Sequence, residues 1–535
     1  MELLGFLCYF CIMKSKIIIG SRGSELALWQ ANYVKDLLAQ INITTEIKII
    51  KTQGDKIQDL SFDKLEGKGF FTKEIEDALL NNEIDVAVHS HKDLPTDSPT
   101  GLIIAAVSKR EDPSELLLIN KDAVDEKQKF NLKQNAIVGT SSARRKSQLL
   151  AYRDDVTLKD LRGNVPTRIQ KLREKQYDAI LIANAGVSRL EIDLSDFYAE
   201  RISPKEFMSA PAQGVLALQI REDDKELFNT LQKINEKEVA ETIYIERKIL
   251  NLFDGGCQLP LGVYCTKEED EEGAMLFKVR VAKADNANTL PKYFYFETKR
   301  YEGFAERIVE KIKSSKGSSV FISRDFKKND FFKNCLDANG YQVFAQSLIE
   351  IKQIPIKKNV KADWIFFTSK NAVKYFFEQS QHLEVSTMKI GAVGKATAEE
   401  IRKYNRRADF IGDSDNTIFT GKKFSAAVGS KLVLFPQAKA SMKTIQFQLK
   451  KEQIIDLIVY ETIKKNKDVV VADVMVFTSP SNVDAFFEAN KINEKQNVVA
   501  MGDATANALK KYGIKPHKMP ATFDDLGLVQ AVCSI

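Results

Sequence analysis

The sequence predicts a multidomain α/β protein, and three observations support this fold class. The chain has 535 residues, which is too long for a single hydrophobic core when one domain takes roughly 150 residues. Short strand-like apolar runs alternate with amphipathic helical stretches almost throughout. The second half also repeats a strand–turn–helix unit. We therefore expect several α/β domains, roughly three to five in number.

The composition argues against two classes of function. The 79 basic and 73 acidic residues nearly cancel to a net charge of +6, so we do not expect a nucleic-acid-binding protein. The apolar run within residues 1–16 is too short to span a bilayer. It also lacks the basic start and the small-residue cleavage site of a signal peptide. We expect residues 1–15 to be an N-terminal extension, with Met1 or Met13 as the start.

The six cysteines and four histidines predict no metal site. Cys8 and Cys11 form a CxxC pair, but no second pair and no nearby histidine complete a zinc site. His89 and His91 share one strand-like segment without a cluster of partners. Because neither an export signal nor a disulfide framework is present, we expect the protein in the reducing cytoplasm.

The first half alternates strands with helices. KIIIG (16–20) is typical of a strand, and ELALWQANYVKDLLAQ (25–40) carries apolar residues at helical spacing. Further buried strands are expected at IDVAVHS (84–90), AIVGT (136–140) and YDAILIA (177–183). From about Glu236 to Lys313 we expect a smaller unit, made of a helix, the GGCQLPLG turn, alternating strands and a basic helix.

A change of composition separates the two halves. KIKSSKGSS (311–319) is small, polar and typical of a linker. Beyond it, IFFTSKNAVKYFFE (365–378) recurs as MVFTSPSNVDAFFE (475–488), and GAVGKATAEEIRKY (391–404) recurs as VAMGDATANALKKYG (499–513). The duplication predicts two similar lobes with a ligand cleft between them.

Arginines follow several predicted strands of the first half. GSRGS (20–24) joins a strand to a helix, where free backbone N–H groups and the helix dipole favour an anion. GTSSARRK (139–146) repeats this arrangement, and LRGNVPTR (161–168) and SRL (188–190) add further arginines. Guanidinium groups bind carboxylates bidentately. Unrelated surface arginines are the simpler interpretation, but the repeated geometry favours a ligand with many carboxylates.

Two lysine-bearing segments and one cysteine complete the candidates. LEGKGFFTKE contains Lys68, and VHSHKDLPT places Lys92 and Asp93 at a strand end. Neither the first of these nor GAVGKAT has the glycine spacing of a phosphate loop, which argues against nucleotide binding. Cys257 lies in GGCQLPLG, a tightly shaped loop in which a thiol can serve as a covalent attachment point.

Taken in order, the motifs of the first half resemble those of porphobilinogen deaminase (hydroxymethylbilane synthase). The resemblance covers about Lys16 to Lys313 and is carried by GSRGSELALWQ, KTQGD, GKGFFTKEIE, VHSHKDLPT, GTSSARRK, LRGNVPTR, YDAILIANAGVSRL and GGCQLPLG. It implies two lobes similar to type-2 periplasmic binding proteins and a small α+β domain. The implied boundaries are residues 16–112 and 212–234 for domain 1, 113–211 for domain 2 and 235–313 for domain 3.

The resemblance also implies a chemistry. A dipyrromethane cofactor is attached to Cys257 through a thioether, and Asp93 is the catalytic carboxylate. Porphobilinogen loses ammonia to give an electrophilic azafulvene, whose positive charge a carboxylate stabilises. Four couplings then give hydroxymethylbilane. The implied cofactor contacts are Lys92, Ser142, Arg144 and Arg145, and the implied substrate contacts are Arg22, Ser24, Lys68, Arg162, Arg168, Arg189 and Gln213.

One segment departs from the family pattern. In SAPAQGVLAL (209–218), Ala212 stands where the family usually has glycine, although Gln213 and Gly214 are retained. We expect this alanine to tighten the crossover between the first two domains.

The second half resembles uroporphyrinogen-III synthase over about Ser318 to Ile535. FTSKNAV, VGKATA, IVYET, FTSPSNV and MGDATA carry this resemblance through their order and duplication. The chain is expected to cross between two lobes near Ile351–Pro355 and Tyr460–Lys464. The implied boundaries are residues 314–319 for the linker, 320–352 and 464–535 for the first lobe, and 356–460 for the second.

The implied reaction closes the linear tetrapyrrole, inverts one pyrrole and releases the terminal hydroxyl as water. Such catalysis needs no metal or organic cofactor and can rest on holding a flexible substrate in a folded pose. Tyr460 matches the family tyrosine that assists the departure of the hydroxyl. The candidate substrate contacts are Thr368, Ser369, Thr397, Ser479, Ser481 and Thr505.

Two other functions stay open at this point. A two-lobed binding protein for a carboxylated solute would explain the lobes and arginines but not Cys257. A deaminase whose residues 318–535 form a catalytically inactive module would explain the first half alone. We expect the bifunctional enzyme of haem biosynthesis, as a cytoplasmic monomer. Its expected partners are porphobilinogen and the linear tetrapyrrole, with neither nucleic acid nor membrane.

Overall fold

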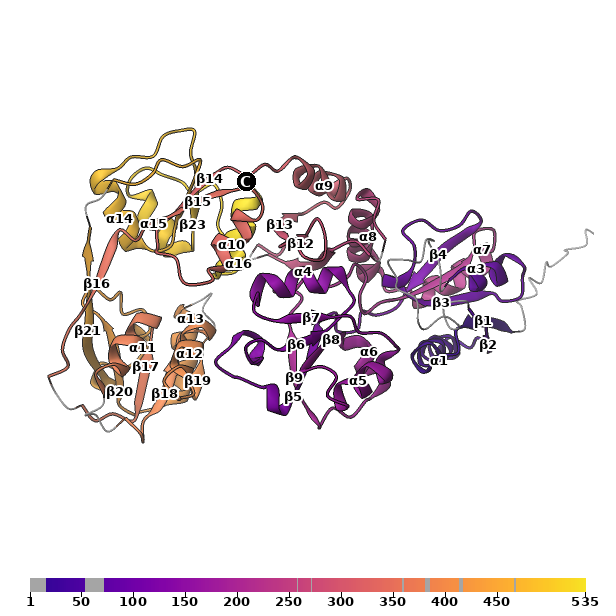
Figure 1. Ribbon diagram of the computed structural model, residues 1–535, viewed down its shortest axis with the longest axis horizontal. Helices are drawn as coiled ribbons and strands as arrows, with labels where there is room; N and C mark the ends of the chain where they lie inside the picture. The colour runs from indigo at the N-terminus through magenta and orange to yellow at the C-terminus, as the bar shows by residue number, and fades with distance from the viewer. Residues whose placement is uncertain are drawn as a thin grey trace, which may run out of the picture. The chain divides into compact units, whose positions relative to one another are not determined.

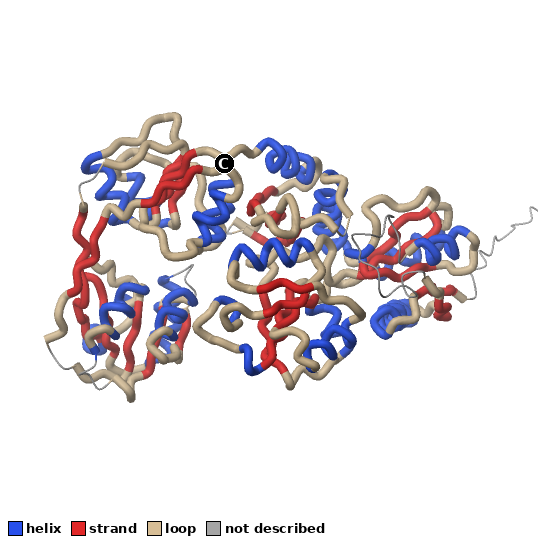
Figure 2. The backbone as a smooth tube through the Cα atoms, in the orientation of Figure 1, coloured by secondary structure: helices blue, strands red, loops and turns tan. Residues whose placement is uncertain are grey.

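The computed structural model describes residues 16–52, 72–256, 258–270, 272–357, 360–380, 385–412, 417–465 and 468–535. The chain forms two compact units that divide chiefly between Lys316 and Gly317. Each unit combines helices with β-sheets (Figures 1 and 2), which confirms the predicted α/β class. Among the described residues, no helix has the length and apolar character needed to cross a membrane.

The first unit contains two five-stranded sheets with equivalent strand orders. In each, three strands run parallel, and the fourth runs antiparallel to both of its neighbours. The first sheet has the order β2 (Thr45–Ile49), β1 (Ile17–Ser21), β3 (Val86–Ser90), β10 (Leu216–Arg221), β4 (Leu102–Val107). The second has the order β7 (Thr157–Lys159), β6 (Ile137–Gly139), β8 (Ala179–Ala183), β5 (Glu115–Asn120), β9 (Phe197–Ile202).

The chain crosses between these two sheets twice, and each crossing leads into the antiparallel fourth strand. Residues 108–114 connect β4 to β5, and residues 203–215 connect β9 to β10. The two crossovers lie side by side, because the Glu111 N–H donates to the Gly214 carbonyl at 2.9 Å. Gly214 has a φ of +90°, and a Cβ there would lie 2.3 Å from the Glu111 oxygen. The crossover therefore requires glycine at this position.

Capping residues explain where the main helices of these lobes begin. Ser24, Ser142 and Asn164 precede three helices, and each side-chain oxygen accepts a backbone N–H from the first turn. The three helices are α1 (Glu25–Gln40), α4 (Ala143–Tyr152) and α5 (Val165–Arg173). The other α-helices in the described residues of the two lobes are α3 (Lys73–Leu80), α6 (Asn184–Leu190) and α7 (Lys225–Leu231).

The rest of the first unit follows the predicted order of helix, turn, strands and basic helix. The strands form one antiparallel sheet, β11 (Leu261–Glu269), β12 (Met275–Lys283) and β13 (Lys292–Thr298). They are preceded by α8 (Lys237–Leu252) and followed by α9 (Phe304–Ser314). The predicted linker stretch of residues 311–319 is too long, because Lys311 to Ser314 still belong to α9.

The second unit has two sheets whose central strands are parallel. The smaller has the order β15 (Gln342–Ala345), β14 (Ser319–Ile322), β22 (Val474–Phe477), β23 (Asn497–Ala500). The larger has the order β16 (Ile349–Gln353), β21 (Ile454–Lys464), β20 (Val433–Ala438), β17 (Trp364–Phe367), β18 (Lys389–Ala392), β19 (Phe410–Ile411). The described α-helices of this unit are α11 (Lys370–Phe377), α12 (Lys395–Arg402), α13 (Thr417–Val428), α14 (Pro480–Ala489), α15 (Asp503–Lys510) and α16 (Asp525–Cys533). Helix α10 (Phe331–Asp337) is divided between the two units, since Asn334–Asn339 belong to the first.

The internal repeat of the sequence is a repeat of structure. The first copy is β17, α11, β18 and α12 in the larger sheet, and the second copy is β22, α14, β23 and α15 in the smaller sheet. Strands β16 and β21 pair antiparallel from Ile349 with Lys464 to Gln353 with Tyr460. They run side by side between the two lobes (Figure 1), at the places where the sequence predicts the crossings.

Candidate functional sites

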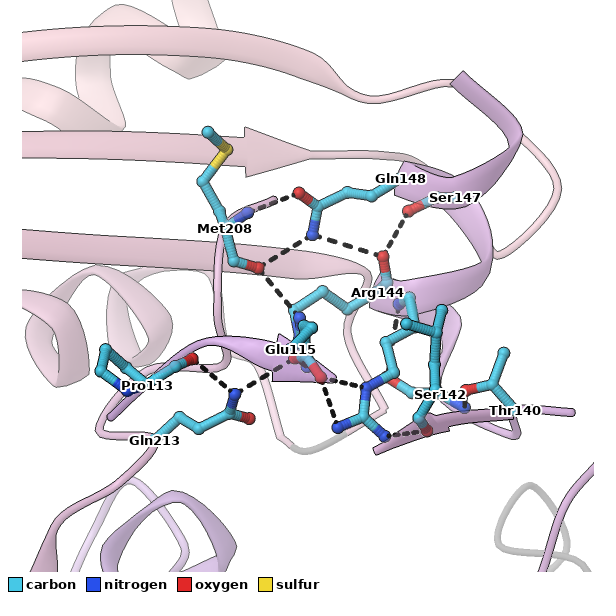
Figure 3. A network of polar contacts seen from close by, with 11 residues as sticks. Pro113, Glu115, Thr140, Ser142, Arg144, Ser147, Gln148, Met208 and Gln213 are labelled. Atoms are coloured by element: carbon cyan, nitrogen blue, oxygen red, sulfur yellow. Dashed lines mark hydrogen bonds and ion pairs between the residues drawn. The ribbon is translucent and has the colours of Figure 1, made fainter. Parts of the chain in front are cut away.

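A buried carboxylate, Glu115 on β5, joins the predicted cofactor arginines (Figure 3). Arg144 donates to Glu115 Oε1 at 2.7 Å, and Arg145 donates through Nε and Nη2 to Oε2 at 2.9 and 2.7 Å. The remaining guanidinium donors reach the carbonyls of Met208 at 2.9 Å and Leu181 at 3.1 Å. Because these arginines already have partners inside the protein, the network holds their guanidinium groups in a defined geometry.

Three further charged residues interact electrostatically with this network. Asp93, exposed at the end of the short turn after β3, interacts electrostatically with both Lys92 and Arg168. Burial lowers the pKa of Lys92, and Asp93 opposes that change. Burial and the positive charge of Arg145 likewise lower the pKa of Arg168, to about 10. The predicted catalytic carboxylate therefore lies within the field of the predicted cofactor and substrate cations.

The charges of the cluster suit a ligand with carboxylates. Among the described residues, four cations, Lys92, Arg144, Arg145 and Arg168, interact with the carboxylates of Glu115 and Asp93. Burial by itself raises the pKa of Glu115, but Arg145, Arg144 and Lys92 outweigh it and bring the pKa to about 2. Acetate and propionate groups are the kind of ligand that such partly buried guanidinium and ammonium groups bind.

The segment that carries Lys92 and Asp93 is held by an arginine of α8. Arg247 donates through Nη1 to the carbonyls of His91 at 3.2 Å and Leu94 at 2.9 Å, and through Nη2 to the carbonyl of Pro95. These carbonyls flank the two charged residues on both sides. The turn is thereby fixed to the helix that precedes Cys257 in the chain.

Arg189 and Gln213, two predicted substrate contacts, lie at the crossover between the lobes. Arg189 donates to the Gly214 carbonyl at 2.7 Å, and its guanidinium lies 5.6 Å from the centre of the Trp29 ring. Gln213 donates to the Pro113 carbonyl at 2.8 Å and to Glu115 at 3.2 Å. Both side chains are buried and have structural partners, so their contact with substrate stays a prediction.

The other predicted residues of the first half are more scattered. Arg22 is half-buried in the turn between β1 and α1, and Ser24 caps α1, where it accepts the Ala27 N–H at 3.4 Å. Arg162 is half-buried before α5, and Ser142 caps α4. Lys68 and Cys257 lie outside the described residues.

In the second unit, the predicted contacts follow the carboxyl ends of parallel strands. Thr368 and Ser369 come after β17, and Ser479 and Ser481 come after β22, where Ser369 and Ser479 cap the following helices. Thr397 in α12 and Thr505 in α15 are only 5% and 3% exposed. Burial favours a structural role for these two threonines, and their contact with substrate remains untested.

Tyr460 lies on β21, one of the two strands between the lobes. Its hydroxyl is 3.2 Å from the Ser369 hydroxyl, and the centre of its ring is 5.7 Å from that of Tyr375. Burial raises the pKa of Tyr460, while the Ser369 hydroxyl acts in the opposite direction. A protonated phenol in this position can donate a proton to a departing group.

Sequence reasoning did not identify Glu115, Arg247 or the buried Glu246 described below. The signal for Glu115 was present, because a carboxylate inside the apolar run SELLLIN needs a buried cationic partner. No comparable signal identifies Arg247, since its partners are backbone carbonyls more than 150 positions away.

Glu246 on α8 connects three parts of the first unit. Its side chain is fully buried and accepts from Arg110 Nη1 at 2.8 Å, from the Ala212 N–H at 2.7 Å and from the Cys265 N–H at 2.8 Å. Arg110 and Ala212 lie on the two crossovers, and Cys265 lies on β11. Both crossovers are therefore fastened to α8 through one carboxylate.

Comparisons with known proteins assign each half to a family. Residues 17–229 match the family model described as porphobilinogen deaminase, dipyromethane cofactor binding domain. Residues 330–530 match the model described as uroporphyrinogen-III synthase HemD. These matches confirm both predicted resemblances and the predicted cofactor, although the first model ends before Cys257.

Relatives at the level of sequence cover the first half. The porphobilinogen deaminase of Oceanobacillus iheyensis is 45% identical over 258 residues, which are 48% of this chain and 82% of that protein. That of Nitratiruptor is 39% identical over 295 residues, 55% of this chain and 92% of that protein. A solved uroporphyrinogen-III synthetase from Helicobacter pylori is 18% identical and covers 40% of this chain and 98% of its own, with a TM-score of 0.32.

Proposed function

Because the chain belongs to the porphobilinogen deaminase family and carries a uroporphyrinogen-III synthase domain behind it, we propose that one protein catalyses two consecutive reactions. It joins four porphobilinogen molecules into hydroxymethylbilane with release of ammonia, and then closes that product to uroporphyrinogen III. The fusion makes the protein a bifunctional enzyme of haem biosynthesis. The single observation that carries the deaminase proposal is the cationic cluster around Asp93.

In the deaminase reaction, Asp93 acts on the substrate. As ammonia leaves porphobilinogen, positive charge develops on the pyrrole, and the exposed carboxylate of Asp93 stabilises it. The same carboxylate accepts hydrogen bonds from pyrrole N–H groups and helps to move the proton lost at each coupling. Arg247 supports this role by fixing the backbone on both sides of Asp93.

The cations of the cluster orient the carboxylates that each pyrrole ring carries. Arg144 and Arg145 are held by Glu115, so they present a fixed pair of guanidinium groups at the start of α4. Lys92 and Arg168 complete the cluster. The dipyrromethane, when attached at Cys257, supplies the pyrrole carbon to which the first substrate is joined. We assign Arg22, Ser24, Lys68, Arg162, Arg189 and Gln213 to the binding of the growing chain.

In the synthase reaction, the two lobes hold hydroxymethylbilane in a folded pose. Tyr460 gives its proton to the terminal hydroxyl, the carbon–oxygen bond breaks and water leaves. The cationic substrate closes onto the inverted ring and then loses a ring proton, which returns to Tyr460. Hydroxyl and backbone N–H groups after β17 and β22, at Thr368, Ser479 and Ser481, bind the carboxylates.

We place this enzyme in a reducing compartment, the cytoplasm, as a monomer. Cys265, Cys335 and Cys533 are buried, and none of these three described cysteines forms a disulfide, which is compatible with reducing conditions. Sedimentation of the purified full chain measures its oligomeric state.

Isomer analysis tests the bifunctional proposal. Hydroxymethylbilane that escapes cyclises without an enzyme to the symmetric type I isomer. The full chain, given porphobilinogen, should yield chiefly type III, because the tethered synthase meets newly released intermediate at raised effective concentration. A chain ending at Ser315 should consume porphobilinogen at a similar rate but yield type I. The two isomers are separated by chromatography after oxidation to porphyrins.

Two results would contradict the proposal. Type III product from the shortened chain would mean that residues 318–535 are not needed for ring closure. Type I product from the full chain would mean that these residues form an inactive module. Adding residues 318–535 as a separate chain should restore type III, and less efficiently at low concentration if tethering matters.

A further inference from the structure

The two copies of the synthase repeat use the same capping hydroxyl in different ways. Ser369 and Ser479 occupy equivalent positions, because each is the second residue after its strand and caps the next helix. The backbone angles of the two caps are nearly identical, with φ and ψ of −158° and 157° at Ser369 and −159° and 155° at Ser479. A difference between their partners therefore reflects side chains rather than backbone.

In the second copy, the capping oxygen of Ser479 accepts hydrogen bonds from its own helix. Ser479 Oγ accepts the Asn482 N–H at 3.3 Å and also the Asn482 side-chain amide at 3.0 Å. The amide oxygen of Asn482 in turn accepts the Leu348 N–H at 2.9 Å. The Ser479 oxygen thus has both of its lone pairs engaged by one neighbouring residue.

In the first copy, the corresponding neighbour is Ala372, which has no polar side chain. Ser369 Oγ accepts only the Ala372 N–H from its own helix, at 3.1 Å, and this leaves its hydroxyl proton and one lone pair for another partner. That partner is Tyr460, whose hydroxyl lies 3.2 Å away. The two copies have therefore diverged. Among the described residues, Ser479 bonds only within its own helix turn, whereas Ser369 caps its helix and also contacts the Tyr460 hydroxyl.

We infer that Ser369 is a positioning residue, whose hydroxyl donates its proton to the Tyr460 oxygen and leaves the tyrosine proton for the substrate. This inference rests on the proposed role of Tyr460 as proton donor. A tyrosine that gave its own proton to Ser369 would have none directed at the departing hydroxyl. Donation from Ser369 also stabilises the phenolate that forms when the proton leaves, which makes Tyr460 a stronger acid.

The surroundings keep the tyrosine in this relationship. Tyr460 is paired in β21 with Gln353 of β16, so its backbone is held from the neighbouring strand. Its ring packs against Tyr375, which lies on α11, the helix that Ser369 caps. Ser369 and Tyr375 thus act from one helix on the hydroxyl and the ring of the same residue.

Three substitutions at Ser369 separate this role from capping. In the full chain supplied with hydroxymethylbilane, Ser369→Ala should lower kcat for type III formation about three- to tenfold, the worth of one hydrogen bond, with little change in KM. Ser369→Gly should lose as much activity, although glycine keeps most of the capping stability. Ser369→Thr, which keeps the hydroxyl and the cap, should retain kcat. Thermal unfolding of each variant reports on the cap itself.

A double-mutant cycle with Tyr460→Phe tests whether Ser369 acts through the tyrosine. If Ser369 acts through the tyrosine, Ser369→Ala should cause no further loss of kcat in the Tyr460→Phe background. A full further loss, or an increase confined to KM, would mean that Ser369 contacts substrate directly and would overturn the inference. Full activity of Ser369→Gly would likewise overturn the inference, because it would mean that the serine only caps helix α11. Normal activity of Tyr460→Phe alone would instead refute the proposed role of the tyrosine.

Discussion

Ala212 donates its backbone N–H to the Glu246 carboxylate at 2.7 Å while its own φ is +63°. The hydrogen bond and the fully buried methyl group hold an alanine in a left-handed conformation that favours glycine. The family residue at this position is usually glycine, so the chain retains the backbone geometry of the crossover with a less suitable residue.

Ala212→Gly should stabilise the protein. Removing the Cβ relieves a cost of about 1 kcal/mol, and the Glu246 hydrogen bond is kept because it uses the backbone N–H. The free energy of unfolding in urea measures this. Ala217→Gly, in strand β10 without a positive φ, is the matched control and should destabilise by about 0.5–1 kcal/mol. Equal losses in the two variants would contradict the strain at Ala212.

Cys257→Ser should remove the cofactor. Purified wild-type protein is expected to be heavier than its sequence by two linked pyrrole units, and the variant should lack this increment together with deaminase activity. Intact mass spectrometry makes the comparison without depending on turnover. Cys265→Ser, which changes a buried free cysteine of β11, should keep the increment. An active wild-type protein without added mass would disprove the attachment.

Asp93→Asn should lower deaminase turnover at least about a hundredfold, because the amide keeps the shape but loses the charge that stabilises the developing cation. Porphobilinogen consumption in single-turnover and steady-state assays measures the loss. Asp97→Asn is the control: Asp97 lies four positions further along and accepts from Asn251 at 2.8 Å on the surface. Similar rates for both variants would remove Asp93 from the chemistry.

The lowered pKa of Glu115 predicts that the stability of the protein depends on pH. Its pKa in the folded protein, about 2, lies below the ordinary value of 4.5. The carboxylate therefore stabilises the folded state above about pH 4.5, and this contribution, on the order of 3 kcal/mol, is lost as the pH falls toward 2. The difference in unfolding free energy between wild type and Glu115→Gln should be constant near neutral pH and shrink below about pH 4.5.

A surface carboxylate provides the control for Glu115. Glu83 pairs with Lys48 at 2.8 Å with both side chains about half exposed, so Glu83→Gln should change stability by about 0.5 kcal/mol or less. A difference between wild type and Glu115→Gln that did not vary with pH would show that the carboxylate contributes by packing rather than by charge.

Local features of the fold could be predicted from the sequence. The helix predicted at residues 25–40 has those bounds in the structure, because Ser24 caps it and its apolar residues repeat at helical spacing. The strands predicted in IDVAVHS, AIVGT and YDAILIA are also present, each two residues shorter in total than predicted. The boundary of the linker was less accurate, because lysine and serine are compatible with the last turn of a helix.

Pairings between distant residues could not be predicted. The arginines of GTSSARRK were expected to bind a ligand, but their immediate partner is Glu115, about 30 positions earlier in the chain. The spacing of residues in the sequence indicates which of them follow a strand. It does not indicate which carboxylate they pair with in the folded protein. The same limit applies to Thr397 and Thr505, whose burial depends on the packing of neighbouring helices.

Helix α8 sets a limit on distance within the deaminase. Arg247, near the end of this helix, donates to backbone carbonyls on both sides of Asp93. The helix ends at Leu252, five positions before Cys257. Five extended residues span at most about 17 Å. If Cys257 anchors the cofactor, as proposed, the anchor cannot move further than this from the end of the helix that fixes the segment around Asp93. In the proposed reaction, the growing product would then have to move relative to Asp93, because its anchored end cannot move away.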